Sequence, residues 1–393
     1  MKRLRDLMQA LQPRIPESLL AGEGWDRLLA RVGDLPAAAA AGLCGFELKL
    51  DDPAPAADFS VAVTPGPVAR HFPASSEAAT TSTEARLAAY LADWSRPDDW
   101  LMLAYDIVGV AEGRKAAPAV YVRPDARSGT GLPSNGAAFD PDRLAEILGG
   151  ISGGSGDGDG RRALTRAFAA LPPAAVAVFA AVAPERVPGS IRLVVAEVAV
   201  PQLEGFLSRL QWPGSMSMVL RLLSGMRDVS DRFMVAFDVT RDGALPRLGF
   251  EMYPTAAAGA GYQPLLSTWL TTTRADWRGL ISHLGDMALC LPEKAEGLLS
   301  WPKCNIVYGE SGAWRLYMGI NHVKMVIDAE RLQAKAYAGL KCCPLNPGGD
   351  LFGPEAGIGP DPAMVGERGG IRHGVGPGAP PAVRRRCPDL NSR

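Results

Sequence analysis

The stretch GINHVKMVIDAERLQAKAYAGL (319–340) decides the fold that we expect for this chain, because its apolar residues alternate with polar ones. Successive side chains of a β-strand point to opposite faces, so the pattern predicts two strands joined by a short polar turn. One face carries Val323, Met325, Ile327, Ala334, Ala336, Ala338 and Leu340, and the other carries His322, Lys324, Gln333, Lys335 and Tyr337. We expect this basic and aromatic face to meet water or a charged ligand.

Four similar strand pairs are predicted at 45–63, 100–124, 175–198 and 231–254, each preceded by segments with helical spacing. The first strand of the third pair, at 175–183, is rich in alanine and also fits a helix. The order helix–helix–strand–strand thus recurs about five times, and a recurring unit is typical of a closed or stacked architecture. We predict an α+β fold in which ten antiparallel strands close into a barrel with the helices outside, because closure removes the exposed sheet edges.

Closure would make the polar face of every strand pair line a lumen. A ten-stranded barrel has a lumen too wide to be filled by side chains alone. The alternation then places Lys, Arg, Glu and Tyr side chains from all five pairs inside the barrel. If the strands form open sheets instead, the same faces are ordinary solvent faces of antiparallel sheets. The expected lumen residues are Glu47, Tyr121, Arg192, Arg232, Arg247, Glu251, Tyr253, Lys324, Lys335 and Tyr337.

Composition limits the possible partners and compartments. The formal net charge of −1 gives no general attraction to nucleic acid or to an anionic membrane. No run of 18 apolar residues is present, and the N-terminus lacks the apolar core of a signal peptide, so we expect a cytoplasmic protein. The six cysteines form no CxxC pair, which argues against a zinc site. We predict one barrel domain over 1–340 and a disordered Pro/Gly/Arg-rich tail over 341–393.

The recurring order of elements resembles the ABBA-type (PT-barrel) aromatic and peptide prenyltransferases, in which a ten-stranded barrel encloses the substrates. Second strands of that family often carry Lys-x-Tyr triplets, and KAY (335–337) matches this pattern. EMY (251–253) and AVY (119–121) keep the tyrosine but lack the base. The resemblance covers roughly residues 1–340 and depends on topology more than on motifs.

The resemblance implies transfer of an isoprenoid from an allylic diphosphate to an aromatic or peptide acceptor. Basic residues would bind the diphosphate, tyrosine faces would shield the allylic cation, and a carboxylate would remove a proton. The candidates are Lys324, Lys335, Arg247, Arg232 and Arg192 for the diphosphate, Tyr121, Tyr253 and Tyr337 for the shield, and Glu47 with Glu251 in reserve for the base. No DDxxD-type metal motif is present, so no cofactor is expected, although a diphosphate can recruit Mg²⁺ through its own oxygens.

Two other classes of function fit the same residues. The protein could be a non-catalytic module that holds a peptide or small molecule for natural-product biosynthesis, or an interaction protein whose barrel is filled by side chains. Binding without turnover would identify the module, and a dry apolar interior would identify the interaction protein.

Overall fold

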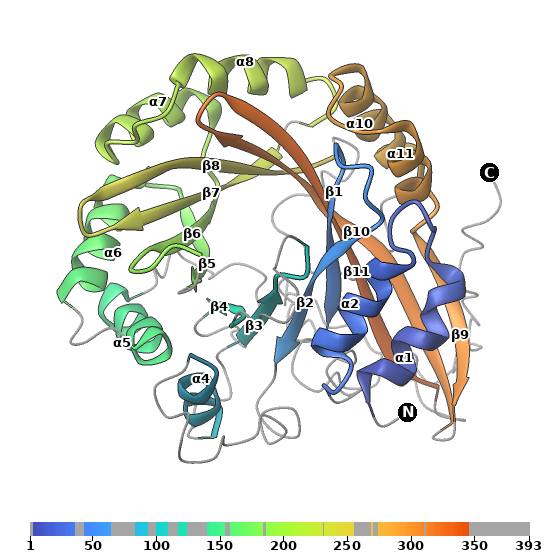
Figure 1. The fold of residues 1–393 in the computed structure, drawn as a ribbon. Coiled ribbons are helices and arrows are strands. Elements are labelled where there is room, and N and C mark those ends of the chain that lie inside the picture. Colours follow the sequence, from blue (N-terminus) through green and yellow to red (C-terminus); the bar gives the residue numbers. More distant parts are fainter. Residues whose placement is uncertain are drawn as a thin grey trace, which may run out of the picture.

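A computed structural model describes residues 3–35, 43–63, 83–92, 100–108, 117–123, 140–153, 158–183, 186–230, 232–254, 269, 274–309 and 312–345. In this part of the chain, strands form a central closed sheet and helices surround it (Figure 1). None of the helices described is long and apolar enough to cross a membrane.

Ten antiparallel strands close into a barrel, as the sequence predicted. Neighbours in sequence pair in order, and the last strand, β11, pairs with both β10 and β1 to complete the ring. The alanine-rich segment at 175–183 forms a strand, which settles the ambiguity in favour of the barrel. The barrel strands are β1 (Cys44–Lys49), β2 (Ala57–Val63), β3 (Trp100–Tyr105), β4 (Ala119–Arg123), β5 (Val176–Val182), β6 (Ile191–Ala196), β7 (Arg232–Thr240), β8 (Gly243–Tyr253), β10 (Gly312–Asp328) and β11 (Arg331–Pro344).

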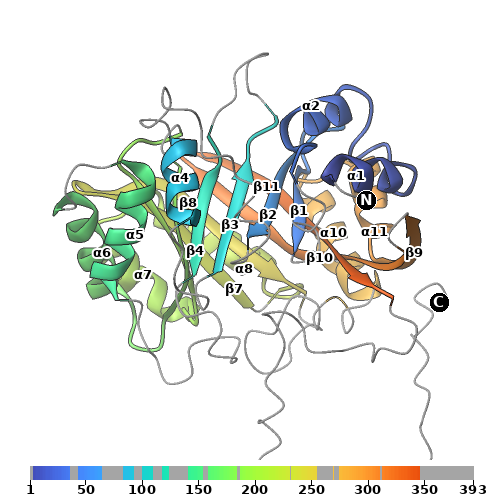
Figure 2. The same ribbon diagram turned by 90° about the horizontal axis from the view of Figure 1, so that it is seen from below.

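The helices lie outside the barrel and cover its outer face (Figures 1 and 2). Their apolar stripes and the outward side chains of the strands form one large core, in which Phe46 packs edge-to-face against Phe59 and Trp301. The helices are α1 (Leu4–Leu11), α2 (Glu23–Val32), α4 (Thr83–Ala92), α5 (Pro141–Ser152), α6 (Gly158–Ala170), α7 (Val200–Arg209), α8 (Met216–Met226), α10 (Arg274–Asp286) and α11 (Pro292–Leu299), with a short 3₁₀ turn η1 (Gln12–Arg14) after α1.

The two-helix, two-strand unit is seen completely three times, as α1–α2–β1–β2, α5–α6–β5–β6 and α7–α8–β7–β8. Before β3 and β4 the structure shows one helix, α4, and residues 64–82 lie outside the described part. After α10 and α11 come three strands, because β9 (Lys303–Gly309) pairs with the first half of β10 and lies beyond the ring. The five-fold repeat therefore stays a prediction, whereas the closed barrel does not depend on it.

The 319–340 hairpin places its residues on the two faces that the alternation predicted, with a register shift between Ile320 and His322. Lys324 lies opposite Lys335 and His322 lies opposite Tyr337, while Val323 and Ala336 are fully buried on the outer face. The β11 strand continues to Pro344, past the domain boundary expected at 340, because β10 begins at Gly312 and provides pairing partners for the added residues. The expected tail at 346–393 lies outside the described residues.

A row of glycines crosses the inner face of three adjacent strands. Gly319 pairs with Gly339, which pairs with Gly45, and Gly339 shares its face with Lys335 and Tyr337. The Trp269 indole lies against this row, so that a Cβ added to Gly319 would come within 2.2 Å of its Cγ. The indole Nε1 donates a hydrogen bond of 2.8 Å to Oδ1 of Asn321. The missing side chains thus make room for one indole inside the barrel.

We expect Gly24→Ala in α2 to destabilise the protein by about 1–3 kcal/mol, because the new Cβ would be 2.4 Å from the backbone oxygen of Pro55. Helix propensity alone predicts the opposite sign, a gain of about 0.5–1 kcal/mol. Gly279→Ala in α10 is the matched control, since nothing lies within 4 Å of its added Cβ. This variant should stabilise the protein. Urea unfolding measures both, and equal stabilisation by the two variants would contradict the close packing of α2 on the 51–56 loop.

Candidate functional site

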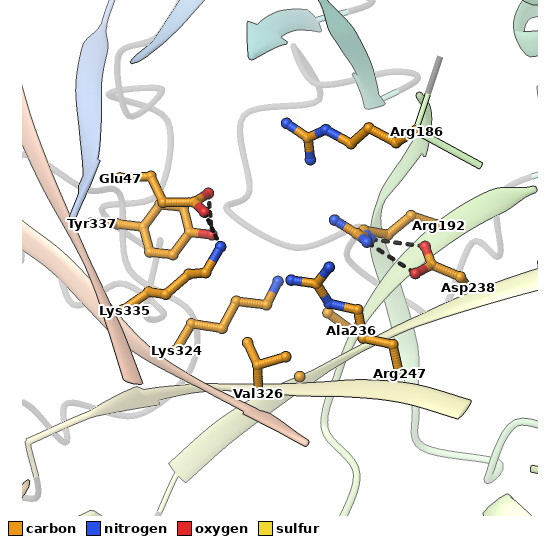
Figure 3. A pocket seen from close by; sticks show the side chains of 11 residues that line it. Glu47, Arg186, Arg192, Ala236, Asp238, Arg247, Lys324, Val326, Lys335 and Tyr337 are labelled. Atoms are coloured by element: carbon orange, nitrogen blue, oxygen red, sulfur yellow. Dashed lines mark hydrogen bonds and ion pairs between the residues drawn. The ribbon is translucent and has the colours of Figure 1, made fainter. Parts of the chain in front are cut away.

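A charged cavity lies inside the barrel, between β6–β8 on one side and β10, β11 and β1 on the other (Figure 3). Its volume is about 20 Å³, which is room for one or two water molecules, because long basic side chains extend into it. The lining residues are Glu47, Arg186, Arg192, Ala236, Asp238, Arg247, Gly249, Lys324, Val326, Lys335 and Tyr337.

Six of the ten residues predicted from the sequence line this cavity, namely Glu47, Arg192, Arg247, Lys324, Lys335 and Tyr337. Three others lie in contact with the same network: Glu251 through Lys324, Tyr121 through Arg192, and Tyr253 through His322. Arg232 differs, because it begins β7, six residues before the cavity residue Asp238. It is not among the residues that line the cavity, and it lies opposite Tyr253 in the β7–β8 ladder.

The first group in the cavity joins three adjacent residues on β1 and β11. Lys335 forms an ion pair with Oε1 of Glu47, and the Tyr337 hydroxyl donates a hydrogen bond of 2.6 Å to Oε2. Burial raises the pKa of Glu47, but the Lys335 ammonium and both hydrogen bonds outweigh it and hold the pKa well below its usual value. Burial and the Glu47 charge raise the pKa of Tyr337. Glu47 is therefore an ionised carboxylate with both oxygens engaged.

The second group is a bidentate pair across β6 and β7. Nε and Nη2 of Arg192 each donate a hydrogen bond of 2.9 Å to Asp238, whose side chain is 8% exposed. Nη1 of Arg192 lies 3.5 Å from the Tyr121 hydroxyl. A planar guanidinium held by two bonds is fixed in orientation, and Figure 3 shows it pointing across the lumen. The Arg192 pKa is raised, since the attraction of Tyr121 and Asp238 outweighs burial, so the group stays charged.

The third group lies on β8 and β10. The Lys324 ammonium donates a hydrogen bond of 3.0 Å to Oε1 of Glu251, and both side chains are about nine-tenths buried. Nε2 of His322 lies 3.8 Å from the other oxygen, Oε2. Burial raises the pKa of Glu251, but Lys324 and His322 outweigh burial and lower it. Burial lowers the pKa of His322 more strongly than Glu251 raises it, which favours a neutral imidazole.

Positive charge exceeds negative charge on the cavity wall. Five basic side chains line the cavity against two carboxylates, Glu47 and Asp238. Arg186 is bound to Asp106, but Arg247 forms no hydrogen bond or ion pair with any residue that the structure describes. The Arg247 and Lys324 side chains point into the same space in Figure 3. The cavity is therefore suited to bind an anion.

An apolar patch adjoins the charged wall on the same inner face of the sheet. Arg192 and Asp238 face the cavity, and the alternation along β6 and β7 brings Val194, Ala196, Met234 and Ala236 to that face as well. They pack with Val178 as a cluster separate from the core under the helices, with Phe179 and Tyr253 against it. Ala236 also lines the cavity, so the two regions are continuous.

Sequence reasoning left several site residues outside the candidate set. Asp238 carried a signal, because it alternates on the strand face of Arg232, but charge pairing with Arg192 needs the register of β6 against β7. Arg186 lies between β5 and β6, where alternation gives no information. His322 stood on the polar face of the 319–340 hairpin but was given no role. In the part of the chain described, no group of three His, Cys, Asp or Glu side chains is placed to hold a metal ion.

Asp58 lies beside Glu47 in the β1–β2 ladder and has an unusual environment. Its Oδ1 accepts hydrogen bonds from the backbone nitrogens of Ile107 and Val108, at 2.7 and 2.9 Å. Burial, and then the Glu47 charge, raise the pKa of Asp58 to about 6. The proximity of the two carboxyl groups therefore favours a proton on Asp58 and a charge on Glu47.

We expect Asp58→Asn to stabilise the protein at pH 8, by about 1–3 kcal/mol over the wild type, and to have a smaller effect at pH 4. An acid whose pKa rises on folding weakens the fold as the pH increases from its unfolded pKa, near 4, to its folded pKa, about 6. Asparagine keeps an acceptor for the two backbone donors and never ionises. The measurement is urea unfolding at several pH values, with the exposed Asp228→Asn as control. A gain that does not change with pH would contradict the assignment.

The sequence matches no protein-family model, and no curated protein sequence is significantly similar to it. The functional assignment therefore depends on the geometry of the cavity.

Proposed function

We propose that this barrel binds an allylic isoprenoid diphosphate in its lumen and transfers the isoprenoid to an aromatic or peptide acceptor. One observation carries the proposal. The basic side chains of the cavity wall and the apolar patch lie next to each other on one continuous inner surface. An isoprenoid diphosphate has the same two-part character, with a highly charged head and a hydrocarbon tail. The ten-stranded barrel and the resemblance to ABBA-type prenyltransferases support the same interpretation.

The basic wall supplies the head-group site in this proposal. Arg247 has no competing carboxylate among the described residues, and Arg192 and Lys324 keep N–H donors directed at the same space. Charge-assisted hydrogen bonds from these groups stabilise the negative charge that builds on the leaving diphosphate. Lys335 and Arg186 complete the positive field from the opposite walls. Mg²⁺ could enter only with the diphosphate, through its own oxygens.

The rest of the lumen supports the reacting carbon. Tyr337, Tyr121 and Tyr253 face the inside and can stabilise an allylic cation through their ring faces. Exclusion of water by the closed barrel protects such a cation from hydrolysis. A ligand needs more space than the present 20 Å³, so binding requires the long basic side chains that extend into the cavity, Arg247 among them, to change conformation. These side chains have several rotatable bonds and can do this without moving the strands.

A second candidate is a binding module that holds an anionic small molecule or peptide without reaction. The observation that favours it is that Glu47, Asp238 and Glu251 are all engaged by cations, so none is a free base. Product formation separates the two functions. The transferase releases inorganic diphosphate and gives a prenylated acceptor, whereas the module binds the ligand and returns it unchanged.

We expect Arg247→Ala to weaken binding of geranyl diphosphate about 10- to 100-fold, because a hydrogen bond to a charged group contributes about 1.5–3 kcal/mol. Isothermal titration calorimetry measures the affinity, and Arg221→Ala on the exposed face of α8 is the control that removes the same charge elsewhere. If the wild type does not bind, or if both variants bind equally well, the proposed head-group site is wrong.

We also expect affinity to rise from inorganic diphosphate to dimethylallyl diphosphate to geranyl diphosphate, at least tenfold over the series, because each buried CH₂ adds about 0.8 kcal/mol. Val194→Thr replaces a methyl group of the apolar patch by a hydroxyl at nearly constant volume. This substitution should weaken the binding of geranyl diphosphate several-fold and leave the affinity for inorganic diphosphate unchanged. An equal loss of affinity for both ligands would indicate that the isoprenoid tail does not lie on this patch.

A further inference from the structure

His322 occupies a special position in the barrel wall. A β-bulge between Ile320 and His322 shifts the register of β10 against β11, and bulges re-aim the side chains beside them. The imidazole stacks on Tyr337 with ring centroids 4.3 Å apart and planes 25° apart, and the Tyr253 ring lies 6.0 Å away. Two of the tyrosines proposed to surround the reacting carbon therefore flank this histidine.

The two ring nitrogens of His322 have different surroundings. Nε2 is fully buried, has no hydrogen-bond partner among the described residues, and lies 3.8 Å from Oε2 of Glu251. The side chain as a whole keeps 14% of its surface exposed, so this exposure belongs to side-chain atoms other than Nε2. A proton on Nε2 would point toward the carboxylate and would leave the lone pair of Nδ1 free.

Glu47, the base expected from the sequence, is poorly suited to that role. Its two oxygens are held by Lys335 and Tyr337, and a carboxylate that is stabilised in this way is a weak proton acceptor. Glu251 is engaged at one oxygen by Lys324 and directs the other at His322. Glu251 thus has the geometry of a residue that orients a base.

We propose that His322 accepts the proton released from the acceptor, with Glu251 as the positioning residue that stabilises the imidazolium. This inference rests on the proposed transferase function and adds to it the identity of the base. Neutral imidazole is the form required before the reaction, and the balance of burial and Lys324 against Glu251 and Glu47 favours it. Tyr253 and Tyr337, the other titratable groups against the ring, are uncharged at neutral pH.

The step balances without another reactant. The allylic C–O bond breaks and its electron pair leaves with the diphosphate, where the basic wall stabilises it. An electron pair of the acceptor forms the new bond to the allylic carbon, and the acceptor proton passes to Nδ1 of His322. The resulting positive charge faces Glu251, which Lys324 keeps ionised.

The first test compares His322→Asn with the wild type, using geranyl diphosphate and either L-tryptophan or L-tyrosine as acceptor. We expect His322→Asn to bind geranyl diphosphate within about threefold of the wild type and to lose about 100-fold or more in kcat. The wild-type rate should fall as the pH decreases and His322 becomes protonated, and this acid limb should be absent from the variant. A variant with wild-type turnover and binding would overturn the role of His322 alone.

The second test needs no turnover. In a ¹⁵N NMR titration of the histidine ring nitrogens, assigned with His322→Asn, we expect His322 to be neutral at pH 7 with its proton on Nε2. Glu251→Gln should lower its pKa further, because a favourable negative charge is lost. An imidazolium at pH 7, or no response to Glu251→Gln, would overturn the dyad. Failure of the wild type to bind geranyl diphosphate would instead overturn the proposed transferase function, and with it the role of His322 as the base.

Discussion

Closure of the sheet through β11, which pairs with β10 on one side and β1 on the other, is the constraint on which the rest of the structure depends. In an open sheet the face of Lys324, Lys335 and Tyr337 would be an ordinary wet surface. In a closed ring that face is withdrawn from bulk water, and each charged group on it needs a partner. The three acid–base pairs of the lumen, each between adjacent strands, are the consequence.

The cavity wall carries information about function because one of its basic groups, Arg247, lies outside these pairs. Burying an ion is costly unless an opposite charge and hydrogen bonds offset the loss of water, so a lumen that evolved for stability alone would contain matched charges or apolar residues. Here four of the five basic groups on the cavity wall are each paired with a carboxylate, whereas Arg247 has no partner in the described residues. We propose that a bound anion supplies the missing charge. The apolar patch beside it favours a ligand with a hydrocarbon part.

The network also assigns different chemistry to residues of the same type. Glu47 and Glu251 are both buried carboxylates next to a lysine. Glu47 uses its second oxygen to accept from Tyr337, whereas Glu251 directs its second oxygen at a histidine that lacks a hydrogen-bond partner in the part described. A sequence motif cannot separate these two roles, because the difference comes from the strand that lies next to each carboxylate and from the bulge before His322.

Alternation along single strands determined much of this protein. It predicted the 319–340 hairpin, the strand pairs and six of the eleven residues that line the cavity, because a period of two can be recognised from neighbouring residues alone. Tertiary structure decided what depends on pairing between distant segments. The register of β6 on β7 joined Arg192 to Asp238, the loop before β6 placed Arg186 at the cavity, and pairing with β10 extended β11 to Pro344. These outcomes depend on which strands become neighbours when the ring closes, and no local pattern contains that information.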